Sequence, residues 1–313
     1  ADSTKRFPAY NVQWSPDSKN IAVIKWDMTP LKEFWVINSL SMPRPTLETY
    51  KYQMPGEKEN PIEHLYIFDT ETGVRKEVNT SAFKDQTLDI QTAELNPGDV
   101  TKGYRTSIWT GDSKRFYISR TSRDLKRVDI CSYTIGQDTL VPVIEERLNT
   151  YIDFINVLSP NEGKEIIHWS ERDGWGHLYL YTEDGKLKNR ITKGPWHVEK
   201  IVRLDSKNRV VYFTASGRTE GENPYYMHLY RCNLDGTGLK QLDEKNFFHE
   251  PVMTYNAGYF VDNYSRSDCA PVSELRDAQG NKIMTLEQAD LSQLIAAGYK
   301  FPEIFKVKAG DGV

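Results

Sequence analysis

Ser15-Pro16-Asp17-Ser18-Lys19 is a tight polar turn between two β-rich runs, and turns of the same kind recur four more times along the chain. The others are Thr110–Lys114, Ser159–Gly163, Leu204–Lys207 and Thr254–Gly258. After the second turn, the repeat length is about 45 to 50 residues, which is the length of one four-stranded propeller blade. The first interval is nearly twice as long, so it contains an insertion or a degenerate unit.

Each unit continues into an aromatic run and a second, Gly-centred turn. Val12 and Trp14 alternate with polar neighbours, which indicates a strand with one solvated face, whereas Ile21–Ile24 is apolar on both faces, like an inner strand. The aromatic runs are His64–Asp69, Val128–Tyr133, His177–Tyr181, His228–Arg231 and Val272–Arg276. Because only a neighbouring unit can cover each apolar face, we predict an all-β fold. It is a β-propeller of about five four-stranded antiparallel blades over residues 1–285.

Residues 29–61 interrupt the first unit and predict a hairpin arm that projects from the first blade. The arm carries the aromatic residues Phe34, Trp35, Tyr50 and Tyr52 on either side of Pro43-Arg44-Pro45, and its prolines limit edge pairing. It is either a structural flap or a subunit contact, and exposed aromatic residues on an arm are typical of an interface.

The pattern changes after Thr285. Leu286–Ala297 has apolar residues at helical spacing and is followed by Gly298, a natural C-cap, so it predicts the one C-terminal helix. Phe301–Val307 then predicts a strand that begins a further element. We therefore interpret residues 286–313 as a helix and a linker.

The composition excludes several classes of protein. The 313 residues carry a net charge of −4, which argues against nucleic-acid binding, since that requires a basic face. No apolar run reaches the ~18 residues of a membrane-spanning helix. The three cysteines are odd in number and far apart, so no disulfide framework is indicated.

Motifs that carry chemistry are nearly absent. There is no Gly-x-Ser-x-Gly, and the nearest run, Thr214–Gly217, lies in a β context, so we predict no catalytic residue. The six histidines lack His-Glu-x-x-His and Cys-x-x-Cys companions, and no phosphate-binding loop occurs, so no metal site and no cofactor is predicted. His177 and His228 each precede Leu-Tyr at matching positions, which favours a structural hydrogen-bonding role.

One charged turn is a candidate for substrate binding, namely Glu171-Arg172-Asp173-Gly174-Trp175. Loops of this kind ring one face of a propeller, where ligands and partners bind. The alternative is an internal arginine–carboxylate latch with Trp175 packed on the blade. Arg218, with Glu220 and Glu222 nearby, lies in the equivalent loop of the next blade and leaves the same two alternatives open.

Six stretches are long enough to compare with known families: Trp14–Asp17, Arg44–Gly56, Ser170–Tyr181, Tyr212–Ala215, Pro224–Arg231 and Leu275–Asp277. They resemble the dipeptidyl peptidase IV family of S9B-type, prolyl-oligopeptidase-like serine peptidases, in particular its bacterial, Bacteroidetes-like members. The resemblance covers nearly all of the chain.

The resemblance implies an N-terminal eight-bladed propeller, then an α/β-hydrolase domain with a Ser-Asp-His triad. Such enzymes remove dipeptides from peptide N-termini, often after proline or alanine. In the family, the propeller narrows access to the catalytic chamber, a pair of propeller glutamates holds the substrate's amino terminus, and the arm contributes to dimer contacts. The Asp-Trp-Val-Tyr-Glu-Glu stretch that carries this pair is not found here and is expected upstream of Ala1. The hydrolase domain is expected beyond Val313, so the triad is not in this chain.

Two functions follow as hypotheses. The first is the non-catalytic propeller region of a secreted or periplasmic dipeptidyl peptidase, which gates access, orients peptide substrates and supports a homodimer through the arm. The second is a stand-alone propeller scaffold that binds a protein partner. About five blades of eight leave two uncovered apolar faces, so we expect an open arc of blades or self-association.

Overall fold

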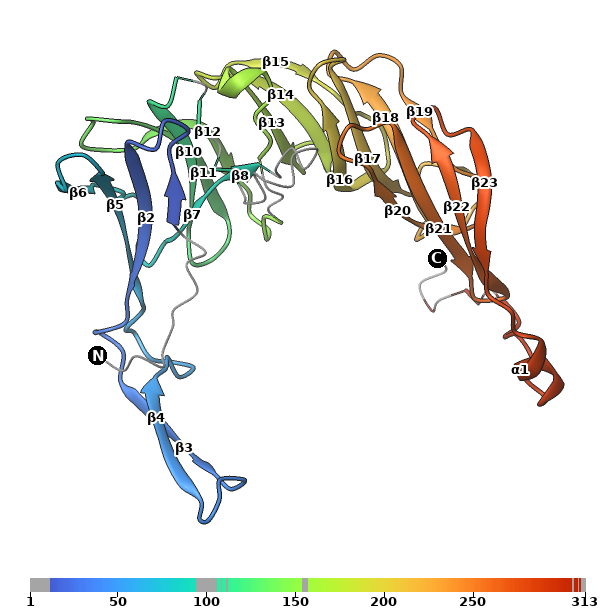
Figure 1. Cartoon of the computed structure of the whole chain (residues 1–313), viewed down its shortest axis with the longest axis horizontal. Helices are drawn as coiled ribbons and strands as arrows, with labels where there is room; N and C mark the ends of the chain where they lie inside the picture. The colour runs from blue at the N-terminus through green and yellow to red at the C-terminus, as the bar shows by residue number, and fades with distance from the viewer. Residues whose placement is uncertain are drawn as a thin grey trace. The chain divides into compact units, whose positions relative to one another are not determined.

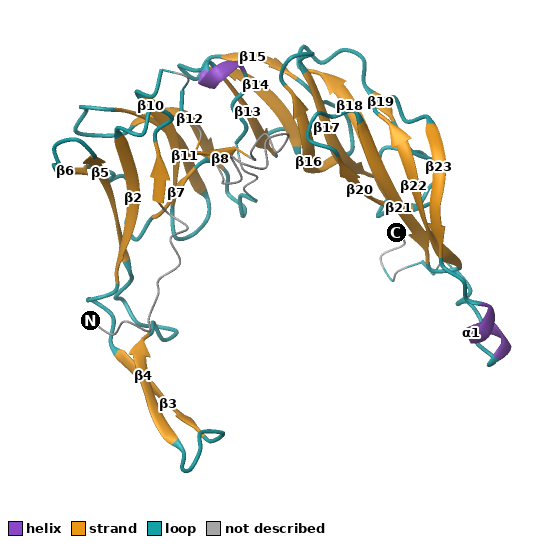
Figure 2. Ribbon diagram, viewed as in Figure 1, coloured by secondary structure: helices purple, strands orange, loops and turns teal. Residues whose placement is uncertain are grey.

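The computed structural model describes residues 12–93, 106–107, 109–110, 112–153, 157–305, 307–308 and 310. Nearly all regular structure in these ranges is antiparallel strand (Figure 2). Four sheets have four strands and one has three, and two hairpins form small sheets of their own. The all-β prediction is therefore confirmed at the level of repeated antiparallel sheets. Within the same ranges, no helix is long and apolar enough to span a membrane.

The five larger sheets follow one another along the chain (Figure 1). Sheet I contains β1 (Val12–Trp14), β2 (Asn20–Asp27), β5 (Ile62–Asp69) and β6 (Arg75–Val78). Sheet II contains β7 (Thr87–Ile90), β10 (Arg115–Thr121), β11 (Arg127–Thr134) and β12 (Val141–Arg147). Sheet III contains β13 (Glu165–Ser170), β14 (His177–Thr182) and β15 (Leu187–Arg190). Sheet IV contains β16 (His197–Asp205), β17 (Val210–Ser216), β18 (Met227–Asn233) and β19 (Lys240–Gln241). Sheet V contains β20 (Phe248–Met253), β21 (Tyr259–Arg266), β22 (Cys269–Asp277) and β23 (Lys282–Gln288).

The remaining elements are short. The hairpin β3 (Glu33–Asn38) and β4 (Thr46–Lys51) lies between β2 and β5 in the sequence and extends away from them (Figure 1). The pair β8 (Thr92–Ala93) and β9 (Thr106–Ser107) lies between β7 and β10 in the sequence. A 3-10 turn covers Asn161–Gly163, and the α-helix α1 covers Ser292–Ala296.

The chain divides into two compact units, and each has its own apolar core. The first unit holds sheets I and II, and its core joins residues of both: Ala22, Ile24, Leu65, Ile67 and Val78 from sheet I and the adjoining segment, with Leu88, Ile90, Phe116, Ile118, Cys131 and Tyr133 from sheet II. The second unit holds sheets IV and V, whose shared core includes Val210, Tyr212 and Leu229 with Met253 and Phe260. Consecutive sheets of a unit thus cover each other's apolar faces, as the repeat predicts.

The repeated turn has the geometry that its residues favour. Ser15 accepts a backbone hydrogen bond from Ser18 at 2.9 Å, and Ser18 adopts a left-handed φ of 60°. Thr110 and Ser113 repeat this arrangement, with 2.9 Å and a φ of 58°. A side-chain oxygen at the first position also bonds the acid two residues later, which closes the turn locally.

The C-terminal segment differs from the prediction. β23 continues to Gln288, so the first residues of the predicted helix Leu286–Ala297 are strand, and α1 covers only Ser292–Ala296. These strand residues pair with β22, and Val272 lies opposite Gln288. The pairing satisfies their backbone N–H and C=O groups, which apolar residues at helical spacing do not do by themselves. The strand predicted over Phe301–Val307 is also wrong for the described residues 301–305 and 307, which have no regular structure.

Candidate functional site

The charged loop Glu171–Trp175 joins β13 to β14 and is held to its own sheet by Asp173. This carboxylate accepts a hydrogen bond from the hydroxyl of Tyr179 at 2.6 Å and forms an ion pair with Arg190 at 3.0 Å. Burial of the ring and the bond to Asp173 together raise the pKa of Tyr179. A latch between arginine and carboxylate is therefore present, but its arginine comes from β15.

The two candidate arginines have matching positions on consecutive sheets. The guanidinium of Arg172 lies 4.7 Å from the ring centre of Tyr179, and that of Arg218 lies 5.3 Å from the ring centre of Tyr230. Both tyrosines are the third residue of a His-Leu-Tyr run and are buried. Trp175, in the same loop as Arg172, is 43% exposed, so its indole is available at the surface.

The arm separates its aromatic residues onto two faces. Phe34, Tyr50 and Tyr52 pack against one another with ring centres 5.5 to 6.1 Å apart. Trp35 points to the opposite face, because successive side chains of a strand alternate. There it is joined by Ile37 and, across the hairpin, by Leu47; these three are 61%, 63% and 64% exposed. Ile37 and Leu47 were not among the predicted contact residues, although the alternation of side chains about Trp35 was a usable signal.

A polar cavity of about 310 Å³ lies in the first unit, between the start of β5 and the segment before β7. Glu63 lines it and accepts a hydrogen bond from the backbone N–H of Leu88. Burial raises the pKa of Glu63 above its ordinary value, and the nearby charge of Asp89 adds to this. None of the sequence-based candidates lines this cavity.

The histidines predicted to be structural are both buried and hydrogen-bonded through both ring nitrogens. His177 contacts Thr192 Oγ1 at 3.0 Å and the carbonyl oxygen of Gly194 at 2.9 Å. Burial lowers the pKa of His177. His228 instead contacts two carboxylates, Asp243 at 2.8 Å and Glu222 at 2.9 Å.

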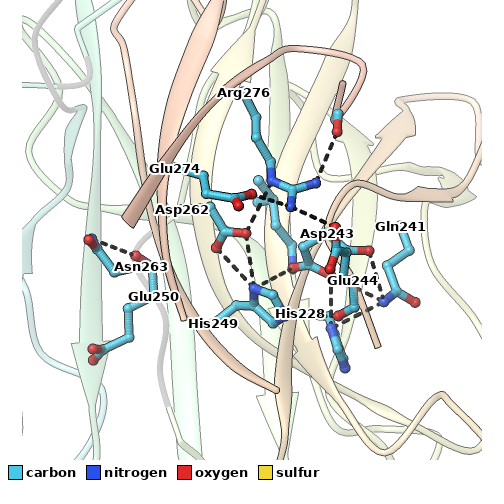
Figure 3. Close-up of polar contacts among 12 residues, drawn as sticks. His228, Gln241, Asp243, Glu244, His249, Glu250, Asp262, Asn263, Glu274 and Arg276 are labelled. Carbon is cyan, nitrogen blue, oxygen red and sulfur yellow. Dashed lines mark hydrogen bonds and ion pairs between the residues drawn. The ribbon is translucent and has the colours of Figure 1, made fainter. Parts of the chain in front are cut away.

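Asp243 and a second histidine extend this cluster into sheet V (Figure 3). His249 Nδ1 lies 3.8 Å from Asp243 and 3.0 Å from Asp262, and Asp262 lies 3.5 Å from Arg276. Burial opposes a charge on His228, but its contacts with Asp243 and Glu222 outweigh burial and raise the pKa of His228. These residues come from separate strands and from the loops between them, so no sequence motif indicated them.

Comparison with known proteins places this fold in a family. Residues 9–271 match the family model described as the dipeptidyl peptidase IV (DPP IV) N-terminal region. The chain is 24% identical over 314 residues to dipeptidyl peptidase 4 of Arthroderma otae and 23% identical to that of Trichophyton equinum. Each alignment covers 96% of this chain and 38% of the relative.

Among solved structures, the crystal structure of Porphyromonas gingivalis dipeptidyl peptidase 4 resembles this one, with a TM-score of 0.74 at 20% sequence identity. The match covers 92% of this chain and 38% of that chain, so this chain spans well under half the length of these relatives. The family model covers most of the chain, and the solved structure shares its fold. The chain therefore belongs to the dipeptidyl peptidase IV family, within its N-terminal region.

Proposed function

We propose that this chain is the non-catalytic propeller region of a dipeptidyl-peptidase-IV-like serine exopeptidase, which releases dipeptides from peptide N-termini. Its roles are to gate access to the catalytic chamber, to orient the peptide and to support a homodimer through the arm. Family membership supports the enzyme class, and the repeated antiparallel sheets support the propeller. The parent protein is secreted or periplasmic in this proposal.

The observation that carries the proposal is the exposed apolar face of the arm, made of Trp35, Ile37 and Leu47. A two-stranded hairpin cannot bury such a face by itself. Apolar surface presented on a projecting element is typical of a protein–protein contact. A second copy of the chain offers the same face, which suits the self-complementary contact of a twofold dimer.

Substrate orientation rests on the loop Glu171–Trp175 and on Arg218. The exposed indole of Trp175 offers a stacking surface for a peptide side chain, and the guanidinium of Arg172 in the same loop offers hydrogen-bond donors for peptide carbonyl groups. Asp173 positions this loop through Tyr179 and Arg190.

An assay with a chromogenic dipeptidyl substrate tests the non-catalytic part of the proposal. We expect no turnover by this chain, because it contains no Gly-x-Ser-x-Gly nucleophile motif. We expect turnover by the full-length product of the same reading frame. Hydrolysis by the chain alone would contradict the proposal.

The alternative is a stand-alone scaffold that binds a protein partner, and the same exposed arm supports it. The reading frame distinguishes the two. Continuation beyond Val313 into Gly-x-Ser-x-Gly and a later histidine supports the peptidase, whereas a stop codon there supports the scaffold.

A further inference from the structure

The cluster around His228, which also contains Glu222, Asp243, His249 and Asp262, has more ionisable groups than are needed to hydrogen-bond the His228 ring. His177 occupies the same position one sheet earlier, and there a hydroxyl and a carbonyl oxygen satisfy the ring. Thr192 Oγ1 also accepts the backbone N–H of Leu178. At His228, Asp243 accepts the backbone N–H of Leu229 in the same way. Asp243 is a carboxylate, however, and it also lies near a second histidine, His249.

The donor atoms of this cluster are spaced as metal ligands are. One donor atom each from His228, Asp243 and His249 lies within 4.8 Å of the other two. His228 Nδ1 is 2.8 Å from Asp243 Oδ1, and His249 Nδ1 is 3.8 Å from the other carboxylate oxygen of Asp243, Oδ2. A tetrahedral zinc ion with bonds of about 2.0 to 2.1 Å places its ligand atoms roughly 3.3 Å apart, between these two values.

Asp262 packs against His249 but is not one of these three ligand residues. Its Oδ1 lies 3.0 Å from His249 Nδ1, and its side chain is fully buried. Two imidazole nitrogens and one carboxylate oxygen form a donor set that suits zinc, and a water molecule completes a tetrahedral site of this kind.

The outer ring nitrogens have the partners that a metal-binding histidine needs. His228 Nε2 lies 2.9 Å from the carboxylate of Glu222, and His249 Nε2 lies 2.8 Å from the carbonyl oxygen of Glu244. A proton on each Nε2 leaves Nδ1 as the atom that binds a metal, and at His228 the ion would replace the contact of Nδ1 with Gln241 Nε2 at 3.1 Å. Carboxylate and carbonyl partners of this kind orient metal-ligating histidines in known sites.

The charge balance also favours a bound cation. The side chains of Glu222, Asp243 and Asp262 are at most 4% exposed. Arg276 is the buried cation in contact with Asp262, and it is shared with Glu274 at 2.6 Å. Buried carboxylates without enough positive charge are costly, and a divalent ion supplies that charge.

We propose that His228, Asp243 and His249 bind a structural Zn²⁺ ion that joins sheet IV to sheet V. His228 lies on β18 and Asp243 follows β19 of sheet IV, whereas His249 lies on β20 of sheet V. The ion acts on folding and does not take part in peptide hydrolysis. This proposal is independent of the proposed peptidase role.

Metal analysis of the purified chain, with any affinity tag removed, tests the proposal. We expect about one zinc per chain by mass spectrometry, and binding of added Co²⁺ with the intense visible bands of tetrahedral coordination. Reversible unfolding in the presence of a chelator removes the ion. We expect this to lower the Tm by about 5 °C or more, and added Zn²⁺ to restore it.

His249→Gln should lose the zinc, whereas His177→Gln, which removes an equally buried histidine outside the cluster, should keep it. The Co²⁺ spectrum of the unmodified chain gives the answer even if a variant fails to fold. Wild-type protein that lacks zinc, gives no tetrahedral Co²⁺ spectrum and keeps its Tm under chelation would overturn the proposal. Protons on the histidines, and not a metal ion, would then pair with the buried carboxylates of the cluster.

Discussion

Ile37 and Leu47 lie directly opposite each other across the β3–β4 hairpin, and their side chains are 63% and 64% exposed. With Trp35 they form one apolar face, and the opposite face carries Phe34 and Tyr50. The arm therefore keeps one aromatic cluster for its own stability and leaves the other face uncovered.

The first prediction concerns this face. Ile37→Ser with Leu47→Ser should weaken self-association at least about tenfold, because each apolar side chain contributes on the order of 1 kcal/mol when it is buried. Light scattering after size-exclusion chromatography over a range of concentrations measures the effect. Glu48→Gln, on the other face, is the matched control and should leave association unchanged. A wild-type chain that is monomeric at every concentration would show that the arm does not join copies of this chain.

The second prediction separates the latch from substrate binding at Asp173. Asp173→Asn keeps an acceptor for Tyr179 and loses only the half-exposed ion pair to Arg190, so it should cost at most about 1 kcal/mol of unfolding free energy. Asp173→Ala also removes the acceptor and should cost about 1 to 2 kcal/mol. Urea denaturation measures both. If neither variant is destabilised, while peptide binding by the full-length enzyme falls, Asp173 is a binding residue and the latch interpretation is wrong.

The third prediction concerns the tight contact of Gly185 with Val143. Gly185 has a φ of 83°, and an added Cβ would overlap the carbonyl oxygen of Val143. Gly174 has a nearly equal φ of 88° but open space around it, so it is a matched control. Gly174→Ala should cost about 1 to 2 kcal/mol for its left-handed backbone alone. Gly185→Ala should cost about 2 kcal/mol more, since backbone must move. Equal losses in thermal unfolding would mean that the contact relaxes freely.

The fourth prediction is a pH dependence set by Glu63. Its pKa is raised by burial in the folded chain, so the folded state holds the proton more tightly than the unfolded state does. The stability from this group is complete below the unfolded pKa near 4.5 and is lost as the pH rises through the folded pKa. Glu63→Gln should therefore be more stable than the wild type at pH 7, with the difference vanishing below about pH 4. Chemical denaturation at both pH values tests this, and Glu33→Gln on the exposed arm should change little at either.

The strands that belong to the repeat were predictable because their signals are local. Pro16 and Ser18 specify a turn whatever surrounds it, and the alternation of Val12 with Trp14 indicates one solvated face before any partner strand is known. β2 runs from Asn20 to Asp27 and includes the inner strand predicted at Ile21–Ile24. β7 was not predictable, since Thr87–Ile90 lies in a segment without clear periodicity and pairs only through β10.

The candidate sites divide in the same way. The arm could be recognised from Phe34, Trp35, Tyr50 and Tyr52, but which of them share a face depends on the pairing of Phe34 with Tyr50. The helical spacing after Thr285 was misleading, because strand pairing of β23 with β22 overrides a weak local preference.

The sequence by itself determined the β-rich repeat, its turns and the family, since these depend on short stretches of neighbouring residues. Only the tertiary structure decided that Asp173 meets Arg190, that His228 meets Glu222 and that His249 lies beside Asp243. Such contacts depend on the register and packing of strands that follow one another at a distance, and no local propensity specifies these.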